Sequence, residues 1–383
     1  MGLFFPFSLH VFMTGSTTPP TPAASIKPLL SLKTPDEILA AKFPADHFFF
    51  DNRLWGRGAP LGIIGPPGIG KSRLTLQLAA SAVCEAPYLG LACTWPPLRF
   101  LFLQAENNTA RLQHDLTALK TSMTQGQWDQ FRKQVHLHTI ETPLDSALNL
   151  SDHGNVSNIA ELIKAAGADV VIFDPLDPFA AGSLNSDSVM RRTLEQLSRL
   201  AKLGNPKAAA VFVHHALTGA RGMSKATGFD RVGYAKGSKS FAAFVRGQFN
   251  VFPQSPDDNT RLIVACGKNS NGPEFQPIGL VLNPVTMFYD PEPDFDFAAW
   301  KDSQRSKPTS RAVVKPEDVA AMVQQLPMKR KTLVKELMDE LGCQKSAAYS
   351  AIDGALGKTI RLNDGKMIEA IPEVEEPTAE PEA

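Results

Sequence analysis

The sequence predicts an α/β fold built on a mostly parallel sheet with helices on both faces. Between about residues 46 and 290, short apolar runs alternate with helical patterns, and each run is apolar throughout. Strands of that kind are buried on both faces, as in parallel sheets. From residue 246 onward, strand-like runs follow one another without helices, which predicts antiparallel strands that extend one edge of the sheet.

Five strands and four helices are predicted in alternation before that edge. The strands are expected at 61–65, 99–105, 135–140, 169–174 and 208–215, and the helices at 71–84, 109–123, 156–166 and 188–203. Three further strands are expected within RGQFNVFPQ, NTRLIVACG and QPIGLVLNP. Ligands of open α/β sheets bind at the carboxyl ends of the parallel strands, so functional residues are sought there.

The composition fits a soluble globular protein and limits its partners. The 383 residues are 43% hydrophobic and 20% charged, and the formal net charge is zero. No global field therefore attracts nucleic acid, so such binding must come from local basic patches. Four cysteines without C-x-x-C spacing argue against a disulfide framework and favour a cytoplasmic location. No segment is apolar for long enough to span a bilayer.

Five segments are expected along the chain. An N-terminal extension over 1–45 is predicted to be largely disordered, and the α/β domain occupies 46–290. A linker rich in Pro, Asp and Ser follows at 291–314, and an acidic, Pro-rich disordered tail occupies 372–383. Between them, residues 315–371 show the order helix, helix, short turn, helix and hairpin, which is typical of a winged helix-turn-helix.

The strongest functional signal is the segment GPPGIGKS between the first strand and the first helix. It matches G-x-x-x-x-G-K-[ST] in the strand-loop-helix setting that this pattern requires. The glycines let backbone N–H groups approach phosphates, Lys71 supplies a charge to the β- and γ-phosphates, and Ser72 offers a hydroxyl to Mg²⁺. The expected ligands are ATP and Mg²⁺, and the expected contact residues are Gly65, Pro66, Pro67, Gly68, Ile69, Gly70, Lys71, Ser72 and Arg73.

Two acidic residues follow apolar strands and are candidates for the chemistry. Asp174 ends the strand DVVIFD, where an outer ligand of Mg²⁺ is needed beside a phosphate loop. A polar residue that ends a strand and caps the next turn is the alternative. Glu106 follows the strand RFLFLQA and can position and deprotonate the attacking water, or it can be an exposed residue at the start of a helix.

The fifth strand ends in two adjacent histidines, His214 and His215. Neighbours on a strand point to opposite faces, so the pair cannot easily share one metal ion. One imidazole here can hydrogen-bond the γ-phosphate or the attacking water and also hold the loop that follows, which makes it a sensor. We expect His215 to be that sensor because it adjoins the loop, with His214 as the rival candidate. Two packed histidines are the alternative.

Two basic segments are candidates for nucleic-acid contact. The Gly-rich loop after the histidines suits single-stranded DNA through its basic side chains and two aromatic ones that can stack on bases, or it is a solvated mobile loop. These side chains are Arg221, Lys225, Arg231, Lys236, Lys239, Phe229 and Tyr234. Lys345 opens the third C-terminal helix, where it would meet duplex DNA if that helix is a recognition helix. A protein-binding winged helix would look the same.

Together these segments resemble a RecA-type ATPase of the plasmid RepA replicative-helicase family. The resemblance covers roughly residues 54–282 and rests on GPPGIGKS, the QAE after the second strand, VVIFDPL, VFVHHA, KGSKSFAAFVRG and GKNSNGPEF. It implies a homo-oligomeric ring with each ATP site at a subunit boundary, Glu106 as catalytic base and Arg246 as a finger from the neighbouring subunit. Lys268 matches a lysine near the same boundary, and the histidine segment couples the γ-phosphate to DNA-binding loops.

The expected function is an ATP-hydrolysing motor that acts on DNA, most like a replicative helicase of that family. Hydrolysis would rest on Lys71, Ser72, Asp174 and Glu106, with Arg246 acting in trans. Two alternatives stay open: a DNA-binding regulator switched by nucleotide, and a partner-dependent loader ATPase of a mobile element.

Overall fold

The computed structural model describes residues 32–142, 145, 148–217, 225–228, 230–255, 258–306, 314–323, 327–341 and 343–371. The chain divides into two units, Met1–His47 and Phe48–Ala383. In the first unit, helix α1 (Pro35–Leu39) starts with a capping box formed by Thr34 and Glu37, and a 3₁₀ turn, η1, spans Ala45–His47. Most of the extension that we expect to be disordered, residues 1–31, lies outside the described part.

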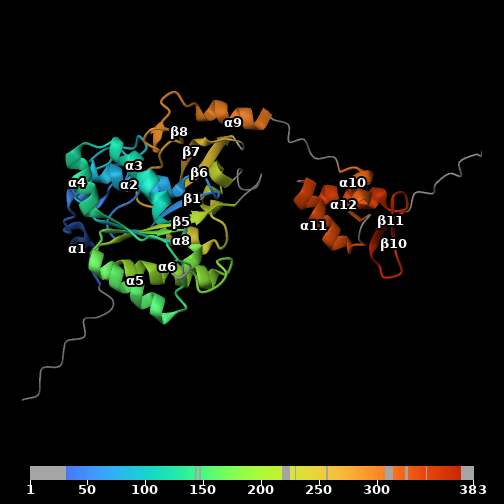
Figure 1. The fold of residues 1–383 in the computed structure, drawn as a ribbon, viewed down its shortest axis with the longest axis horizontal. Coiled ribbons are helices and arrows are strands. Elements are labelled where there is room, and N and C mark those ends of the chain that lie inside the picture. The colour runs from blue at the N-terminus through green and yellow to red at the C-terminus, as the bar shows by residue number, and fades with distance from the viewer. Residues whose placement is uncertain are drawn as a thin grey trace, which may run out of the picture. The chain divides into compact units, whose positions relative to one another are not determined.

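The second unit contains, within the described residues, a nine-stranded sheet in the order β3-β2-β4-β5-β1-β6-β7-β8-β9 (Figure 1). The strands are β1 (Leu61–Gly65), β2 (Phe100–Gln104), β3 (Val135–Leu137), β4 (Val170–Asp174), β5 (Ala209–His215), β6 (Gly247–Ser255), β7 (Asp258–Asn269), β8 (Ile278–Leu282) and β9 (Tyr289–Pro291). The expected parallel sheet with antiparallel edge strands is confirmed, with one correction. Strand β6 lies between β1 and β7 and pairs parallel with β1 and antiparallel with β7. It is parallel to β1 because a crossover that includes α8 (Ser240–Phe244) returns the chain to the end of the sheet where β1 begins.

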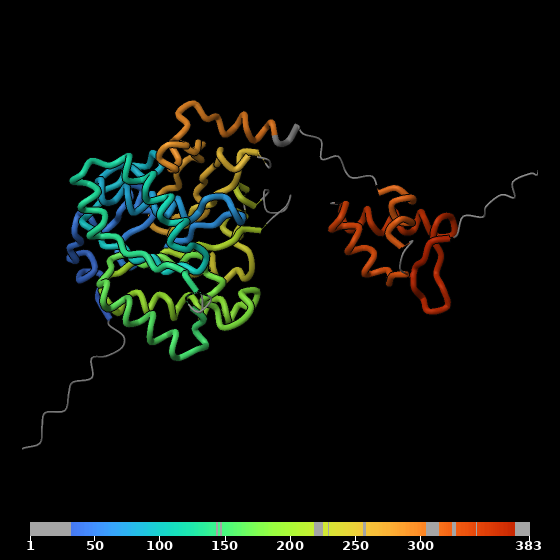
Figure 2. Tube along the Cα trace, in the orientation of Figure 1, coloured from blue at the N-terminus to red at the C-terminus, as the bar shows by residue number. Residues whose placement is uncertain are grey.

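Helices cover both faces of this sheet (Figure 2). On one face, Ile63 and Val211 pack with α2 (Lys71–Val83), α3 (Thr109–Thr121) and α4 (Gln125–Gln134). On the other face lie α5 (His153–Ala166), α6 (Asp187–Ala201) and α8. The strands between them are buried on both sides, as their uniform apolar sequences predict.

Helix α4 was not expected from the sequence because its composition, QGQWDQFRKQ, is mostly polar. It is stabilised locally by a capping box between Thr124 and Gln127. Phe131 is its one fully buried side chain and stacks on Trp128 at 5.7 Å. A single apolar anchor gives little periodic signal, so the tertiary contact decides this helix.

The segment that we expect to be a linker from residue 291 instead contains ordered structure that packs on the sheet. Strand β9 extends to Pro291, and helix α9 spans Phe297–Ser306. Trp300 stacks with Phe297, packs against Phe252 of β6 and donates a hydrogen bond from Nε1 to the carbonyl of Gln254 (2.9 Å). The abundant Pro and Asp residues suggest a linker, but the packing of the partly buried aromatic side chains outweighs them.

The C-terminal elements appear in the expected order. They are α10 (Pro316–Val323), α11 (Arg330–Leu341), α12 (Lys345–Ala355) and a hairpin of β10 (Ile360–Leu362) with β11 (Ile368–Ala370). They share a separate apolar cluster that includes Val319, Leu333 and Ile352. Among the helices of the described residues, none combines the length and apolar character needed to cross a membrane.

Candidate active site

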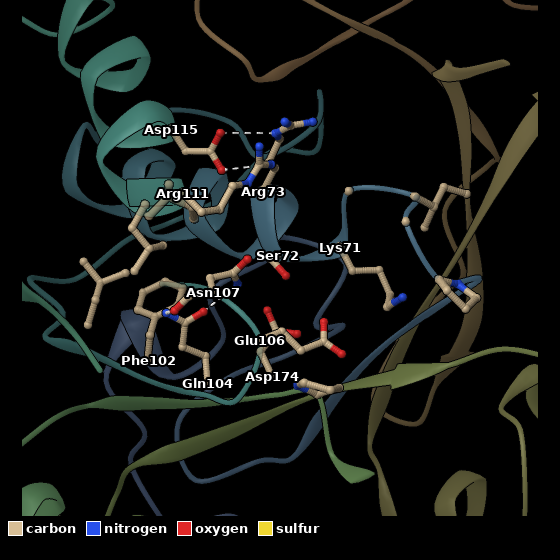
Figure 3. Close-up of a pocket in the computed structure, with 18 of the residues that line it drawn as sticks. Lys71, Ser72, Arg73, Phe102, Gln104, Glu106, Asn107, Arg111, Asp115 and Asp174 are labelled. Atoms are coloured by element: carbon tan, nitrogen blue, oxygen red, sulfur yellow. Dashed lines mark hydrogen bonds and ion pairs between the residues drawn. The ribbon is translucent and has the colours of Figure 1, made fainter. Parts of the chain in front are cut away.

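A cavity of about 250 Å³ lies at the carboxyl ends of β1, β2, β4 and β5 (Figure 3). Its walls include most of the phosphate loop, from Pro67 to Arg73, and the strand-end residues Glu106, Asp174 and His215. The parallel topology explains this convergence, since strands that run in one direction deliver their carboxyl ends to one edge. Four segments that are distant in sequence therefore meet in one pocket.

The phosphate loop connects β1 to α2 with the backbone that the motif requires. Gly68 and Gly70 have φ angles of 71° and 87°, in the left-handed region that favours glycine. Lys71 is 7% exposed, and its Nζ donates a hydrogen bond to the carbonyl of Pro66 (2.7 Å). Burial lowers the pKa of Lys71, while Asp174 and Glu106 oppose that shift. Without nucleotide, the ammonium group of Lys71 therefore binds a carbonyl of its own loop. It can exchange this carbonyl for a phosphate oxygen when nucleotide binds.

Asp174 ends β4 beside the phosphate loop and is 5% exposed. Burial raises its pKa to about 6; a hydrogen bond with the Ser72 side chain opposes this, Glu106 adds to it and Lys71 opposes it. A hydroxyl and a carboxylate in contact are hard oxygen ligands of the kind that Mg²⁺ accepts, with its other positions left to water and phosphate. The residues present therefore fit the expected Mg²⁺ site.

We predict that Asp174→Asn stabilises the nucleotide-free protein at neutral pH. The pKa of Asp174 is near 6 in the folded state against an ordinary value of 3.8. The protonated carboxyl therefore contributes its full stability below pH 3.8, and this contribution is lost as pH rises through 6. Because asparagine cannot ionise, the variant should gain up to about 3 kcal/mol relative to wild type between about pH 4 and pH 7. Thermal unfolding across this range measures the difference.

Asp258→Asn is the matched control for that prediction. A hydrogen bond from the Thr260 side chain lowers the pKa of the Asp258 carboxyl. Ionisation of this group therefore stabilises the fold, opposite in sign to ionisation of Asp174. A wild-type melting temperature that does not fall relative to Asp174→Asn as pH rises would contradict the assignment of a buried carboxyl whose charge Ser72 and Lys71 offset only in part.

Glu106 lies just beyond β2, where its exposed side chain lines the cavity. The turn that carries it is fixed by Gln104, a buried residue that the sequence analysis missed. Its Nε2 donates hydrogen bonds to the carbonyls of His138 (2.7 Å) and Asn107 (3.1 Å). Asn108 then caps α3 by accepting from the backbone of Arg111 (2.9 Å). This support holds a carboxylate at the mouth of the pocket, within the region that an attacking water would occupy.

The two histidines face different cavities, as strand alternation predicts. His215 lines the cavity of the phosphate loop, whereas His214 lines a second cavity with Asp177 and Lys236. His214 Nε2 is 2.8 Å from the carbonyl of Lys236, so Nε2 carries the proton and donates. The Lys236 backbone in turn donates to the carbonyl of His215 (2.8 Å). Burial lowers the pKa of both imidazoles, which favours their neutral forms.

A metal site of the histidines is not supported. The described residues hold no group of three or more His, Cys, Asp or Glu side chains able to bind a metal ion.

Arg246 and Lys268 lie away from the cavity, at the opposite edge of the sheet. Arg246 directly precedes β6, whose first residue Gly247 pairs with Leu61 at the start of β1. Its backbone N–H donates to the carbonyl of Pro60 (2.9 Å), and its exposed side chain is on the surface. Lys268 pairs with the second residue of β6 and donates from Nζ to the carbonyl of Ala242 (2.7 Å). Neither side chain is placed to serve the phosphate loop of its own subunit.

The predicted nucleic-acid residues are only partly free. Lys225 forms an ion pair with Asp230 (3.3 Å) and Arg231 forms one with Glu274, whereas Lys236 and Lys345 are exposed. Arg221 and Phe229 lie outside the described residues. Tyr234 is a correction: it is 2% exposed and donates a hydrogen bond to the carbonyl of Val251 (3.3 Å), so it cannot stack on a base. Its ring packs in the apolar core and is not presented by the loop.

Part of the wall of the cavity comes from two α3 residues that the sequence did not indicate, Arg111 and Asp115. Asp115 of α3 is 8% exposed and binds both Arg73 (Nε, 3.4 Å) and Arg111 (3.2 Å), as Figure 3 shows. Arg73 and Asp115 are 42 positions apart. No local pattern links such residues, and only the packing of α2 beside α3 brings them together.

The mostly parallel sheet, the phosphate loop at the end of β1 and the carboxylate at the end of β4 define an α/β domain of the P-loop NTPase type. Comparison with known proteins agrees with this class: residues 30–220 match the model of a family described as an AAA domain.

A similarity to one curated protein is confined to a short segment. The chain is 38% identical over 84 residues to DNA repair protein RAD51 homolog 2 of Arabidopsis thaliana. The segment covers 21% of this chain and 22% of that protein, so the chain spans about a fifth of its relative's length.

Two solved structures are similar to part of this chain. A KaiC-like protein of Pyrococcus horikoshii OT3 has a TM-score of 0.42 and 13% identity, over 65% of this chain and 97% of that one. The second structure is an isolated ATPase domain, with a TM-score of 0.43 and 10% identity, over 61% of this chain and 84% of that one. At this level of similarity neither structure contributes to the assignment.

Proposed function

We propose that this protein is an ATP-hydrolysing motor that assembles into a ring and acts on DNA, most like a replicative helicase of the RepA type. The observation that carries the proposal is the convergence of Lys71, Ser72, Glu106, Asp174 and His215 on one cavity. It supplies a phosphate loop, a magnesium site, a general base and a polar group near the γ-phosphate in a single pocket.

In the proposed reaction, water attacks the γ-phosphorus and the bond to the β–γ bridging oxygen breaks. Glu106 accepts the proton of the water, and ADP leaves with the bridging oxygen. Lys71 balances charge on the β- and γ-phosphates. Mg²⁺, held by Ser72 and Asp174, would neutralise charge on the same phosphates. A neutral His215 hydrogen-bonds the phosphate or the water, and its backbone contact with Lys236 passes the change to the following loop.

The position of Arg246 supports a ring. Charge on the transferred phosphoryl group calls for a cation such as an arginine finger. The arginines in the described wall of the cavity, Arg73 and Arg111, are both paired with Asp115. Arg246 lies exposed at the end of the sheet where β1 begins, and there a neighbouring subunit in a head-to-tail ring would find it. Lys268, in the adjacent strand, shares this surface.

DNA is the proposed partner. The curated protein that matches part of this chain is named as a DNA repair protein. Lys236 is exposed in the segment that follows the histidine strand, and this Gly-rich segment suits a single strand. We propose that residues 315–371 are a winged helix-turn-helix in which Lys345, exposed at the start of α12, contacts duplex DNA.

Unwinding of a forked DNA duplex tests the proposal. We expect the full chain with ATP and Mg²⁺ to displace one strand, and Lys71→Ala to abolish both ATP turnover and displacement, because the lysine charge on the phosphates is lost. Lys164→Ala is the control, since this exposed lysine of α5 pairs only with Glu161 (2.9 Å) among the contacts described. Wild-type ATP turnover without strand displacement would overturn the motor and favour a nucleotide-switched DNA-binding protein.

A further inference from the structure

Strand β9 reaches the phosphate loop from the far, antiparallel edge of the sheet. Its first residue, Tyr289, is 1% exposed and donates a hydrogen bond from its hydroxyl to the carbonyl of Ile69 (3.3 Å). These residues are 220 positions apart in the chain. A Cβ atom added to Gly70 would collide with the same hydroxyl, so the tyrosine fills the space behind the loop. Gly70 is therefore required both for its positive φ and for this contact.

Two further sets of contacts fix Tyr289 in this place. Gln77 of α2 bonds the backbone of Tyr289 twice, from Nε2 to its carbonyl (2.8 Å) and from its N–H to Oε1 (3.0 Å). Burial raises the pKa of the Tyr289 phenol and the neighbouring Arg73 side chain opposes that shift, while Arg73 Nε lies 3.4 Å from Asp115. A chain of polar contacts thus runs from Asp115 through Arg73 and Tyr289 to the phosphate loop.

The geometry assigns Tyr289 as a positioning residue that orients the phosphate loop for nucleotide binding. In a trans peptide the C=O and the following N–H point in opposite directions. Tyr289 holds the Ile69 carbonyl on the side of the peptide that faces away from the cavity. The N–H of Gly70, in the same peptide, therefore points toward the cavity. That N–H is among the donors a phosphate loop needs. This inference rests on nucleotide binding at the proposed site.

Tyr88 provides a matched control for this role. Tyr88 is also 1% exposed, and its hydroxyl donates a hydrogen bond to the carbonyl of Leu74 in helix α2 (3.1 Å). Leu74 lies beyond the loop, so Tyr88→Phe removes an equivalent buried hydrogen bond without freeing the loop. Both substitutions keep the aromatic ring and its packing, and a purely structural role would give both the same phenotype.

The test compares Tyr289→Phe and Tyr88→Phe by binding of fluorescent ATP and ADP analogues, by steady-state ATP turnover and by thermal unfolding. We expect Tyr289→Phe to weaken binding of both nucleotides about three- to ten-fold, the effect of one hydrogen bond, and to raise KM in proportion. Its kcat should stay within about two-fold of wild type, since the loop contacts ground state and transition state alike. Tyr88→Phe should lower the unfolding temperature about as much as Tyr289→Phe does, while its nucleotide affinity stays at the wild-type value.

The outcomes separate this inference from the proposed function. If wild type binds and hydrolyses ATP but the two variants bind nucleotide equally, Tyr289 has no positioning role and only this inference fails. A fall in kcat at unchanged KM in Tyr289→Phe also overturns it. If wild type binds neither ATP nor ADP, the proposed function fails and the inference fails with it.

Discussion

Replacing Glu106 with glutamine is expected to lower kcat about 10²- to 10⁴-fold while ATP affinity stays close to that of wild type. Glutamine keeps the size of the side chain at the cavity mouth but cannot accept a proton from water. Lys71 and Ser72, which hold the phosphates and Mg²⁺ in the proposal, are unchanged. Binding of a fluorescent ATP analogue and single-turnover hydrolysis, measured on the same preparation, give the two quantities separately.

The control for Glu106→Gln is Glu161→Gln. Glu161 is an exposed residue of α5 that pairs with Lys164 on the helix surface, so its loss should leave both quantities unchanged. Turnover by Glu106→Gln at the wild-type rate would show that another group activates the water and would return Glu106 to the alternative of an exposed residue before a helix.

Arg246→Ala is expected to reduce kcat about 10³-fold or more, and mixing it with Lys71→Ala should restore activity. In a mixed ring, a subunit with an intact phosphate loop but no Arg246 can sit beside one with a dead loop and an intact arginine. The physical reason is the separation seen in one subunit: Arg246 precedes β6 at the amino edge of the sheet, whereas the cavity lies at the carboxyl edge. ATP turnover across a series of mixing ratios measures the rescue.

Arg191→Ala is the control for the finger, since this exposed arginine of α6 pairs with Glu195 (2.9 Å) and is remote from β6 in sequence. It should neither lower turnover nor alter the mixing curve. Arg246→Ala with full turnover would remove the finger, and loss of turnover without rescue on mixing would contradict its action in trans.

The elements that sequence alone predicts well are those whose signal is local. The phosphate loop needs a strand, a glycine-rich turn and a helix in immediate succession, and residues 61–83 provide all three in place. The strands of the parallel sheet are equally clear, because burial on both faces requires an uninterrupted apolar run. Asp174 and Glu106 could be proposed for the site because both follow such runs directly.

Elsewhere the local pattern was misleading because long-range contacts decide the structure. The composition of residues 291–306 indicates a linker, yet Trp300 and its aromatic neighbours find an apolar surface on β6 and form α9. Tyr234 stands among glycines and basic residues, yet its ring is buried in the core. In both cases the free energy of burying an aromatic side chain exceeds the preference expressed by the polar residues around it.

By itself the sequence determined the class of chemistry, because phosphate binding by a loop is a property of eight consecutive residues. Strand alternation likewise required His214 and His215 to face apart, and the structure gives each its own cavity. Only the tertiary structure decided that Tyr289 lies behind the loop and Asp115 beside it. It also placed Arg246 away from the loop, at the end of the sheet where β1 begins. These contacts join residues 42 to 220 positions apart, and their existence depends on how helices and strands pack rather than on any pattern along the chain.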